Sequence, residues 1–186
     1  MASIITATTS SGLTQSADNS GVLQLASGTG NLVTVPAVTG TAMVSGNMPA
    51  FSASRITNQS FSANTWTKIQ FATENWDTAN CFDSTTNYRF TPNVAGYYMI
   101  NLCCDMIFTG TATVAGIGIN KNGSYFSYAP VFYGTMNSGL GFSSGWQVYF
   151  NGSTDYVEAM IYSNATSPSV VGGTGNLFSG VLARTA

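Results

Sequence analysis

The stretch YRFTPNVAGYYMINL, residues 88–102, carries the pattern that decides the fold. Thr91-Pro92 starts a turn, because proline holds the backbone angle that a turn requires. Beyond the turn, Tyr98, Ile100 and Leu102 occupy every second position. Successive side chains of a β-strand point to opposite faces of its sheet, so these three point the same way. We therefore predict a central strand that turns these three side chains toward a hydrophobic core.

Two downstream segments alternate in the same way, and a turn of polar residues, 151–155, separates them. The apolar residues that share a face are Trp146, Val148 and Phe150 in the first segment and Val157, Ala159 and Ile161 in the second. No long amphipathic helix is expected, since Gly, Ser, Thr and Asn interrupt any helical period. Short strands with regular turn signals predict an all-β sandwich or barrel.

Glycines mark places where the chain must pack closely. Residues 114–119 read as a strand that ends in Asn122-Gly123, a hairpin signal. Gly116 and Gly118 share one face of that strand, which predicts close approach by another strand or side chain. Gly96 likewise relieves a tight approach at the start of the central strand.

The composition excludes several functions. The chain has 186 residues, of which 44% are hydrophobic and only 6% are charged, with a net charge of −2 and no histidine. Average domains carry about 25% charged residues. In this chain the uncharged residues Ser, Thr, Asn, Gln and Gly must therefore make most of the surface contacts with water. Its 5 basic side chains cannot neutralise a run of phosphates, so nucleic-acid binding is not expected. Without histidine there is no Ser-His-Asp triad, Cys-His pair or imidazole metal site.

The 3 cysteines, Cys81, Cys103 and Cys104, do not read as a disulfide framework. Their odd number rules out full pairing within the chain, and adjacent cysteines on a strand point to opposite faces. Further sulfur or nitrogen ligands for zinc are missing. We expect all three to be small buried hydrophobic residues of a protein that folds in a reducing cytosol.

Residues 1–46 and 47–186 differ in composition. Residues 1–46 hold no aromatic side chain and one charged residue, Asp18, whereas all 11 Phe, 9 Tyr and 3 Trp follow from Asn47 onward. Aromatic residues supply much of the buried area of a β core. The second region, 47–186, is therefore expected to fold as a head around its own core, and the first, 1–46, is not.

The first region still shows strand signals. Residues 22–25 and 32–35 flank Ser27-Gly28-Thr29-Gly30, which reads as a hairpin turn. An isolated two-stranded hairpin is marginal in water. We expect this segment to need a partner, either further copies of itself or a larger particle. A flexible linker is the alternative, although Gly/Ser linkers do not usually carry such apolar strands.

Residues 71–102 resemble the signature of the C1q domain, of the C1q/tumour-necrosis-factor jelly-roll superfamily. The residues that match its positions are Phe71, Asp77, Phe82, Phe90, Gly96, Tyr98, Ile100 and Leu102. Residues 49–53 are similar to the first strand of that family, 119–123 to its central hairpin and 178–182 to its last strand. The resemblance covers roughly residues 49–184.

This resemblance implies an all-β jelly-roll sandwich of about ten strands that assembles as a compact homotrimer. Faces between subunits favour Tyr, Phe and Met over Lys and Glu, which suits a chain of low charge. The residues predicted to lie in the core or at the subunit interface are Phe90, Tyr98, Ile100, Leu102, Trp146 and Phe178.

The N-terminal region, in particular residues 8–13, 17–25 and 32–36, resembles the β-rich stem of tailed-bacteriophage fibre and virion structural proteins. In those proteins a low-complexity stem precedes a globular trimeric head. Residues 1–46 are accordingly predicted to be a stem or virion-attachment segment. The residues predicted to make the attachment are Val22, Leu23, Leu25, Leu32, Val33 and Val35.

The resemblances together predict a bacteriophage virion structural protein, either a tail fibre or a capsid decoration (head fibre), whose homotrimeric head is displayed on the particle. We expect other virion proteins to bind residues 1–46 and host-surface polysaccharide to meet the head. No signal peptide or membrane span is read from the sequence, so the protein is expected in the virion after synthesis in the host cytoplasm. The alternative is a non-viral C1q-like module that binds carbohydrate or protein.

Catalysis is not expected. Glu74, Asp77 and Asp83 would have to converge on one cleft to act as a glycosidase pair, and no sequence feature shows this. No cofactor is predicted, although a calcium site built from such loop acids stays an alternative. The run Gly172-Gly173-Thr174-Gly175 lacks the lysine of a phosphate-binding loop and is read as a turn.

Overall fold

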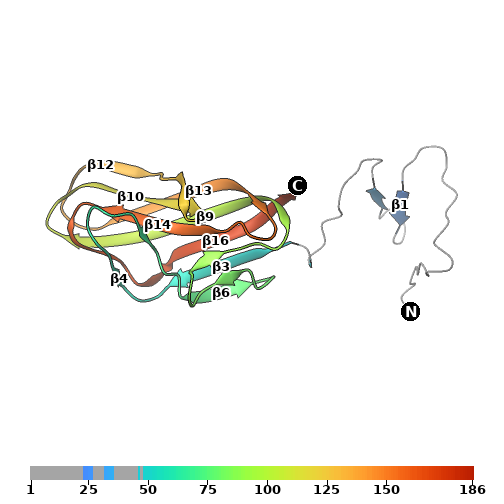
Figure 1. Cartoon of the computed structure of the whole chain (residues 1–186), viewed down its shortest axis with the longest axis horizontal. Helices are drawn as coiled ribbons and strands as arrows, with labels where there is room; N and C mark the ends of the chain where they lie inside the picture. The colour runs from blue at the N-terminus through green and yellow to red at the C-terminus, as the bar shows by residue number, and fades with distance from the viewer. Residues whose placement is uncertain (1–22, 27–31, 36–45, 47) are drawn as a thin grey trace. The chain divides into compact units, whose positions relative to one another are not determined.

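Figure 1 shows the computed structural model of the chain, which describes residues 23–26, 32–35, 46 and 48–186. The chain divides into two compact units, Met1–Ala42 and Met43–Ala186. Each unit is described by itself.

The first unit contains a hairpin of β1 (Leu23–Ala26) and β2 (Leu32–Val35). The strands are antiparallel, with Leu23 opposite Val35 and Ala26 opposite Leu32. The predicted pairing of these two segments is confirmed. The predicted turn at 27–30, and Val22 of the predicted attachment set, lie outside the described residues.

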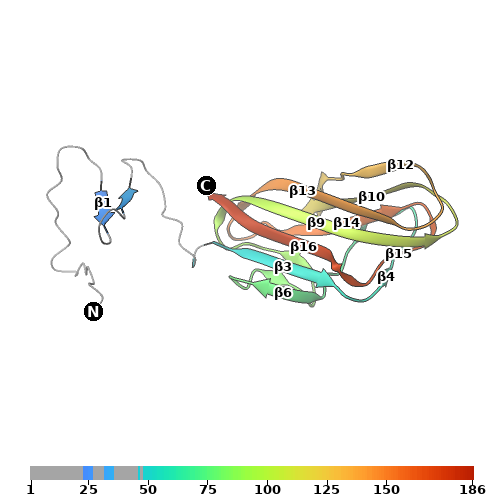
Figure 2. The same ribbon diagram turned by 180° about the vertical axis from the view of Figure 1, so that it is seen from behind.

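The second unit is a sandwich of two antiparallel sheets, seen from opposite sides in Figures 1 and 2. The first sheet is ordered β4-β15-β9-β16-β3-β6, with β13 also paired to β9. Its strands are β3 (Ala50–Arg55), β4 (Gln59–Ser60), β6 (Thr73–Asp77), β9 (Ala95–Thr109), β13 (Leu140–Asn151), β15 (Thr166–Val170) and β16 (Gly173–Thr185). β3 begins and β16 ends at the same end of the sandwich, since Ala50 lies opposite Val181.

The second sheet is ordered β11-β10-β14-β8-β7, with β12 paired to β10 and β5 paired to β14. Its strands are β5 (Thr67–Lys68), β7 (Phe82–Asp83), β8 (Arg89–Phe90), β10 (Ala112–Lys121), β11 (Ser124–Ser127), β12 (Val131–Met136) and β14 (Val157–Ser163). Ten strands of this unit are longer than two residues. The predicted all-β sandwich is confirmed.

Aromatic rings join the two sheets. Phe51 of the first sheet stacks on Phe82 and Phe90 of the second, with ring centroids 4.7 and 4.4 Å apart. Phe178 meets Phe51 edge-on at 5.1 Å. Such pairs add about 0.5–1.5 kcal/mol each beyond the area that they bury. This aromatic stack, Phe51, Phe82, Phe90 and Phe178, is the centre of the core.

β9 is the central strand that the alternation predicts. It pairs with β13 along one edge and with β16 and β15 along the other. Tyr98, Ile100 and Leu102 point inward and are buried, and the Tyr98 hydroxyl donates to the Val94 carbonyl at 2.8 Å. Burial raises the pKa of this phenol, which keeps it a hydrogen-bond donor. The structure places the remaining predicted core or interface residues, Phe90, Trp146 and Phe178, in the core as well.

The close approaches that the glycines predict are present. The segment 127–131 covers the outward face of β10, so a Cβ atom on Gly116 would lie 2.9 Å from the Pro130 carbonyl oxygen. A Cβ atom on Gly118 would lie 2.6 Å from the Ser127 carbonyl oxygen and would collide with the Tyr128 ring. Gly96 faces the end of β16 in the same way, against the carbonyl of Arg184.

Two sequence interpretations are wrong. Residues 173–175 are not a turn but the start of β16, which bulges between Gly173 and Leu177. The bulge is held by the buried Asn176 amide, which accepts from the Asp105 N–H at 2.5 Å and donates to the Val171 carbonyl at 2.6 Å.

The second wrong interpretation is the predicted burial of Cys103. It is only half-buried, whereas Cys81 and Cys104 are buried as predicted. Cys103 and Cys104 do point to opposite faces of β9, so one thiol enters the core and the other lies on the outward side of the sheet. Burial raises the pKa of the Cys81 and Cys104 thiols, which leaves both in the unreactive protonated form.

Replacing Gly118 by alanine tests the packing of 127–131 on β10. The added methyl has no room, so the free energy of unfolding should fall by about 1–3 kcal/mol. Urea unfolding of the full chain, compared at one protein concentration, measures this. Gly175→Ala is the control, because a Cβ atom added there would have no other atom within 4 Å. Equal stability of the two variants would contradict the close approach.

Candidate functional site

The outward side of the first sheet presents a face formed by β9, β13 and β16, here called the open face. Its residues alternate with those that point into the core. The side chains on it are Tyr97, Met99, Asn101, Cys103, Asp105, Ile107, Ser143, Gln147, Tyr149, Leu177, Ser179, Val181 and Arg184. The open face is thus the side of the first sheet that points away from the core.

The open face combines exposed apolar side chains with uncharged polar ones and few charged ones. Tyr97 is 50% exposed, Ile107 45%, and Tyr149 and Val181 are each 42% exposed. Tyr97 lies directly opposite Tyr149, with ring centroids 5.4 Å apart. Across β9, β13 and β16 the charged residues are Asp105 and Arg184. Single exposed apolar residues are ordinary, but a contiguous apolar patch marks an interaction surface.

A second feature lies on the outward side of the other sheet. It is a groove of about 380 Å³, here called the aromatic groove, lined by Trp66, Val114, Tyr125, Tyr128, Val131, Tyr133 and Tyr162. Tyr162 of β14 lies opposite Gly116 of β10, and the neighbouring pair Ile161 and Thr67 brings Trp66 alongside. Segments that are far apart in the sequence therefore meet here.

Several rings of the aromatic groove pack against one another. Trp66 stacks on Tyr128 with centroids 3.7 Å apart, and Tyr125 stands at 83° to the Tyr128 ring at 4.6 Å. The Tyr128 hydroxyl donates to Asn120 Oδ1 at 2.8 Å. Burial raises the pKa of Tyr128, so its phenol stays protonated as this donor. Tyr125 and Tyr133 remain 68% and 76% exposed.

Lys68, Lys121 and Arg89 each have a partner within the chain. Lys68 pairs with Glu158 and Lys121 with Asp155, both at 2.9 Å. The Arg89 guanidinium lies over the Tyr156 ring at 4.1 Å from its centre. No Asp, Glu, Lys or Arg lines the aromatic groove within the part of the chain that the structure describes.

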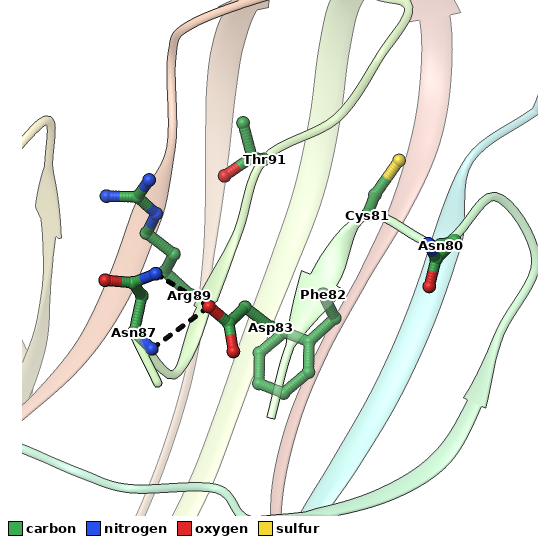
Figure 3. Close-up of a pocket in the computed structure, with 7 residues that line it drawn as sticks. All are labelled: Asn80, Cys81, Phe82, Asp83, Asn87, Arg89 and Thr91. Atoms are coloured by element: carbon green, nitrogen blue, oxygen red, sulfur yellow. Dashed lines mark hydrogen bonds between the residues drawn. The ribbon is translucent and has the colours of Figure 1, made fainter. Parts of the chain in front are cut away.

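The acids singled out in the sequence do not meet in one cleft. Asp83 lines a pocket of about 340 Å³ that holds neither Glu74 nor Asp77 (Figure 3). The Asp77 carboxylate accepts from the backbone N–H groups of Ala79 and Phe82, at 3.1 and 2.7 Å. Glu74 is exposed on β6. Among residues 48–186, no group of three His, Cys, Asp or Glu side chains is placed to hold a metal ion.

The Asp83 carboxylate is occupied by its own loop. It accepts from the backbone N–H groups of Thr85, Thr86 and Asn87 at 3.0, 2.9 and 3.1 Å. The Asn87 amide adds a bond of 2.7 Å, drawn in Figure 3. These donors hold the pKa of Asp83 far below its ordinary value. A carboxylate bound in this way closes a turn and is a poor acid or base.

Sequence reasoning missed the aromatic groove. Its local signal is the pair Tyr125 and Tyr128 beside the predicted Asn122-Gly123 hairpin. The other half, Trp66 and Tyr162, joins only through the pairing of β5 with β14. No helix in the described part of the chain is long and apolar enough to cross a membrane.

Comparison with known proteins finds similarity at the level of structure. No protein-family model and no curated protein matches the chain. The crystal structure of murine APRIL at pH 5.0 matches with a TM-score of 0.52 and 11% identity, over 73% of this chain and 98% of that one. Murine APRIL at pH 8.0 gives 0.51 and 10% over the same shares. Eiger TNF from S. frugiperda gives 0.49 and 10%, over 75% and 93%.

The match to murine APRIL bears on the fold of the head. Residues 48–186 form a TNF-like jelly-roll sandwich, as the strand order and the match to APRIL both show. At such low identity the comparison shows the fold alone.

Replacing Asp83 by Asn tests the role of its carboxylate. The variant keeps the side-chain shape but loses the charge, so the free energy of unfolding at pH 7 should fall by about 1 kcal/mol, a value moderated by solvent screening. Folding lowers this pKa, so the stabilisation is complete above the unfolded-state value of about 3.9 and is lost as the pH falls through the folded-state pKa.

Urea unfolding at a series of pH values measures the difference between wild type and Asp83→Asn. The difference should be constant from about pH 5 to about pH 7 and should shrink below about pH 4. Glu74→Gln, at an exposed carboxylate, is the control and should change stability by less than about 0.5 kcal/mol. A difference that persists unchanged to low pH would show that the charge does not stabilise the turn.

Proposed function

We propose that this protein is a non-enzymatic structural protein of a tailed-bacteriophage particle, a tail fibre or a capsid decoration, whose jelly-roll head is a homotrimer. Residues 1–46 attach the head to other virion proteins, and the head is displayed toward the host surface. The observation that carries the proposal is the open face, which presents exposed Tyr97, Tyr149 and Val181 and has few charged side chains.

The open face supports self-association. Interfaces between subunits are enriched in Tyr and Met and depleted in Lys and Glu at their centres. Tyr97, Tyr149 and Met99 fit that description, and Gln147 beside them can hydrogen-bond without charge. The resemblance to the C1q/TNF superfamily implies threefold assembly, in which such a face is covered by neighbouring copies.

The N-terminal unit supports attachment to something larger. The described strands β1 and β2 make a hairpin of four residues on each side. Two strands alone are marginal in water, and residues 1–46 contain no aromatic residue to build a core. A threefold stem or a virion surface would supply the missing neighbours. The resemblance to phage stem segments points to the virion.

The aromatic groove favours a second candidate function. A non-viral C1q-like module that binds carbohydrate or protein would have the same head, and the cluster around Trp66 would be its binding site. Association with a particle separates the two candidates.

Replacing Val181 by Lys tests the assembly. The wild-type chain should have a solution mass three times its 19.4 kDa, and the variant should dissociate, because burying an unpaired charge is costly. Sedimentation equilibrium measures both masses. Ile56→Lys is the matched control, since Ile56 is 55% exposed and lies outside the open face. A wild-type monomer at micromolar concentration would refute the trimer.

Purified phage particles that encode this chain test the location. Mass spectrometry should find the protein in them, and replacing the predicted attachment residues by serine should remove it from particles without changing the solution mass. The residues to replace are Val22, Leu23, Leu25, Leu32, Val33 and Val35. Particles that lack the wild-type protein would end the virion assignment in favour of the non-viral module.

A further inference from the structure

We propose that the aromatic groove binds uncharged pyranose units of a polysaccharide. The inference rests on the proposed role of the head as a displayed binding module, and adds the site and the class of ligand. Trp66, Tyr125, Tyr128, Tyr133 and Tyr162 supply the binding surface.

The shape and the aromatic lining of the groove suit a sugar ring. Its volume of about 380 Å³ falls within the roughly 300–1,000 Å³ of small-molecule sites. Tyr125 stands almost perpendicular to the Tyr128 ring, so the rings offer a floor and a wall instead of one flat surface. The axial C–H groups of a pyranose form an apolar face that packs on such rings, while its hydroxyls reach the rim.

The lining of the groove carries no charge. No ionised side chain lines the groove among the described residues, so a carboxylated or sulfated sugar would find no counter-ion. Hydrogen-bonding groups are present instead. The Tyr128 hydroxyl and Asn120 form one pair, and the Tyr162 hydroxyl approaches Asn64 Oδ1 at 3.5 Å. Neutral donors and acceptors around aromatic rings suit a neutral hydroxylated ligand.

Part of the groove is preorganised. The stack of Trp66 on Tyr128 is already formed, and Tyr128 is seated on Gly118, where no larger residue would fit. Side chains that are fixed before binding lose little conformational entropy when a ligand arrives, which favours affinity. The exposed rings of Tyr125 and Tyr133 are then available to the ligand and not needed for the fold.

The groove stays accessible when the open face is covered. The groove and the open face belong to different sheets and point outward from opposite sides of the sandwich, so covering the open face leaves the groove free. β12, which carries Tyr133, also lies in the half of the sandwich away from the C-terminus and from the start of β3 (Figure 1). In a trimer three grooves on one body would bind a repeating polymer with avidity gains of about 10²–10⁴.

The test is binding of the full chain to immobilised dextran, yeast mannan and a neutral galactan, with alginate as the charged probe. At least one neutral polymer should retain the wild-type protein more strongly than alginate does. Tyr125→Ala and Tyr133→Ala should each weaken that binding about tenfold or more, as truncation of an aromatic anchor does. Both residues are largely exposed, so these variants should fold.

The matched control is Trp76→Ala, which removes an aromatic side chain that is 49% exposed on β6 of the other sheet and should leave binding unchanged. Soluble oligosaccharide of the retained polymer should change tryptophan fluorescence in wild type and in Trp76→Phe, but not in Trp66→Phe. Retention of none of the neutral polymers, preference for alginate, or binding unaffected by both tyrosine variants would overturn the inference.

These outcomes separate the inference from the proposed function. A protein that is trimeric and present in particles, but fails every sugar test, loses the groove assignment and keeps the virion role. A protein that binds neutral sugar through Tyr133, but is absent from particles, keeps the groove and loses the virion role.

Discussion

The structure depends on the aromatic stack between its two sheets. Phe51 is in contact with Phe82 and Phe90 of the opposite sheet. Phe178, which lies on the same sheet as Phe51, packs edge-on against it and completes the stack. Without this contact the inner, apolar face of each sheet would be exposed to water. The chain has few charged residues that could keep such a face soluble. When the inner faces of the two sheets pack together, the other side of each sheet faces outward. Every second residue of a strand then lies on this outward side.

The outward faces are where function is expected. On one sheet the outward residues are apolar around Tyr97 and Tyr149, which suits contact with another copy of the chain. On the other sheet, glycines in β10 let the segment 127–131 fold over the strand and seat Tyr128 beside Trp66. In the two proposals made above, low charge has two consequences: it lets the open face serve as an interface between copies, and it suits the aromatic groove to neutral ligands.

Local alternation was enough to predict the strands at 98–102, 146–150 and 157–161 and their inward side chains, because these segments show a period of two directly. Local alternation does not predict which distant segments pair with each other. The aromatic groove needs Trp66 beside Tyr162, which only the β5–β14 pairing supplies. Residues 173–175 were read as a turn from their glycines, whereas tertiary bonds of Asn176 hold them as a bulged strand.

Reaction of Cys103 with N-ethylmaleimide tests most directly whether the open face is covered. Its thiol is half-buried in the single subunit and lies between Ser143 and Leu177 on that face, while Cys81 and Cys104 are buried controls. Followed by mass spectrometry of the native protein, Cys103 should be protected in wild type and labelled in Val181→Lys. Equally rapid labelling of Cys103 in both proteins would contradict the account.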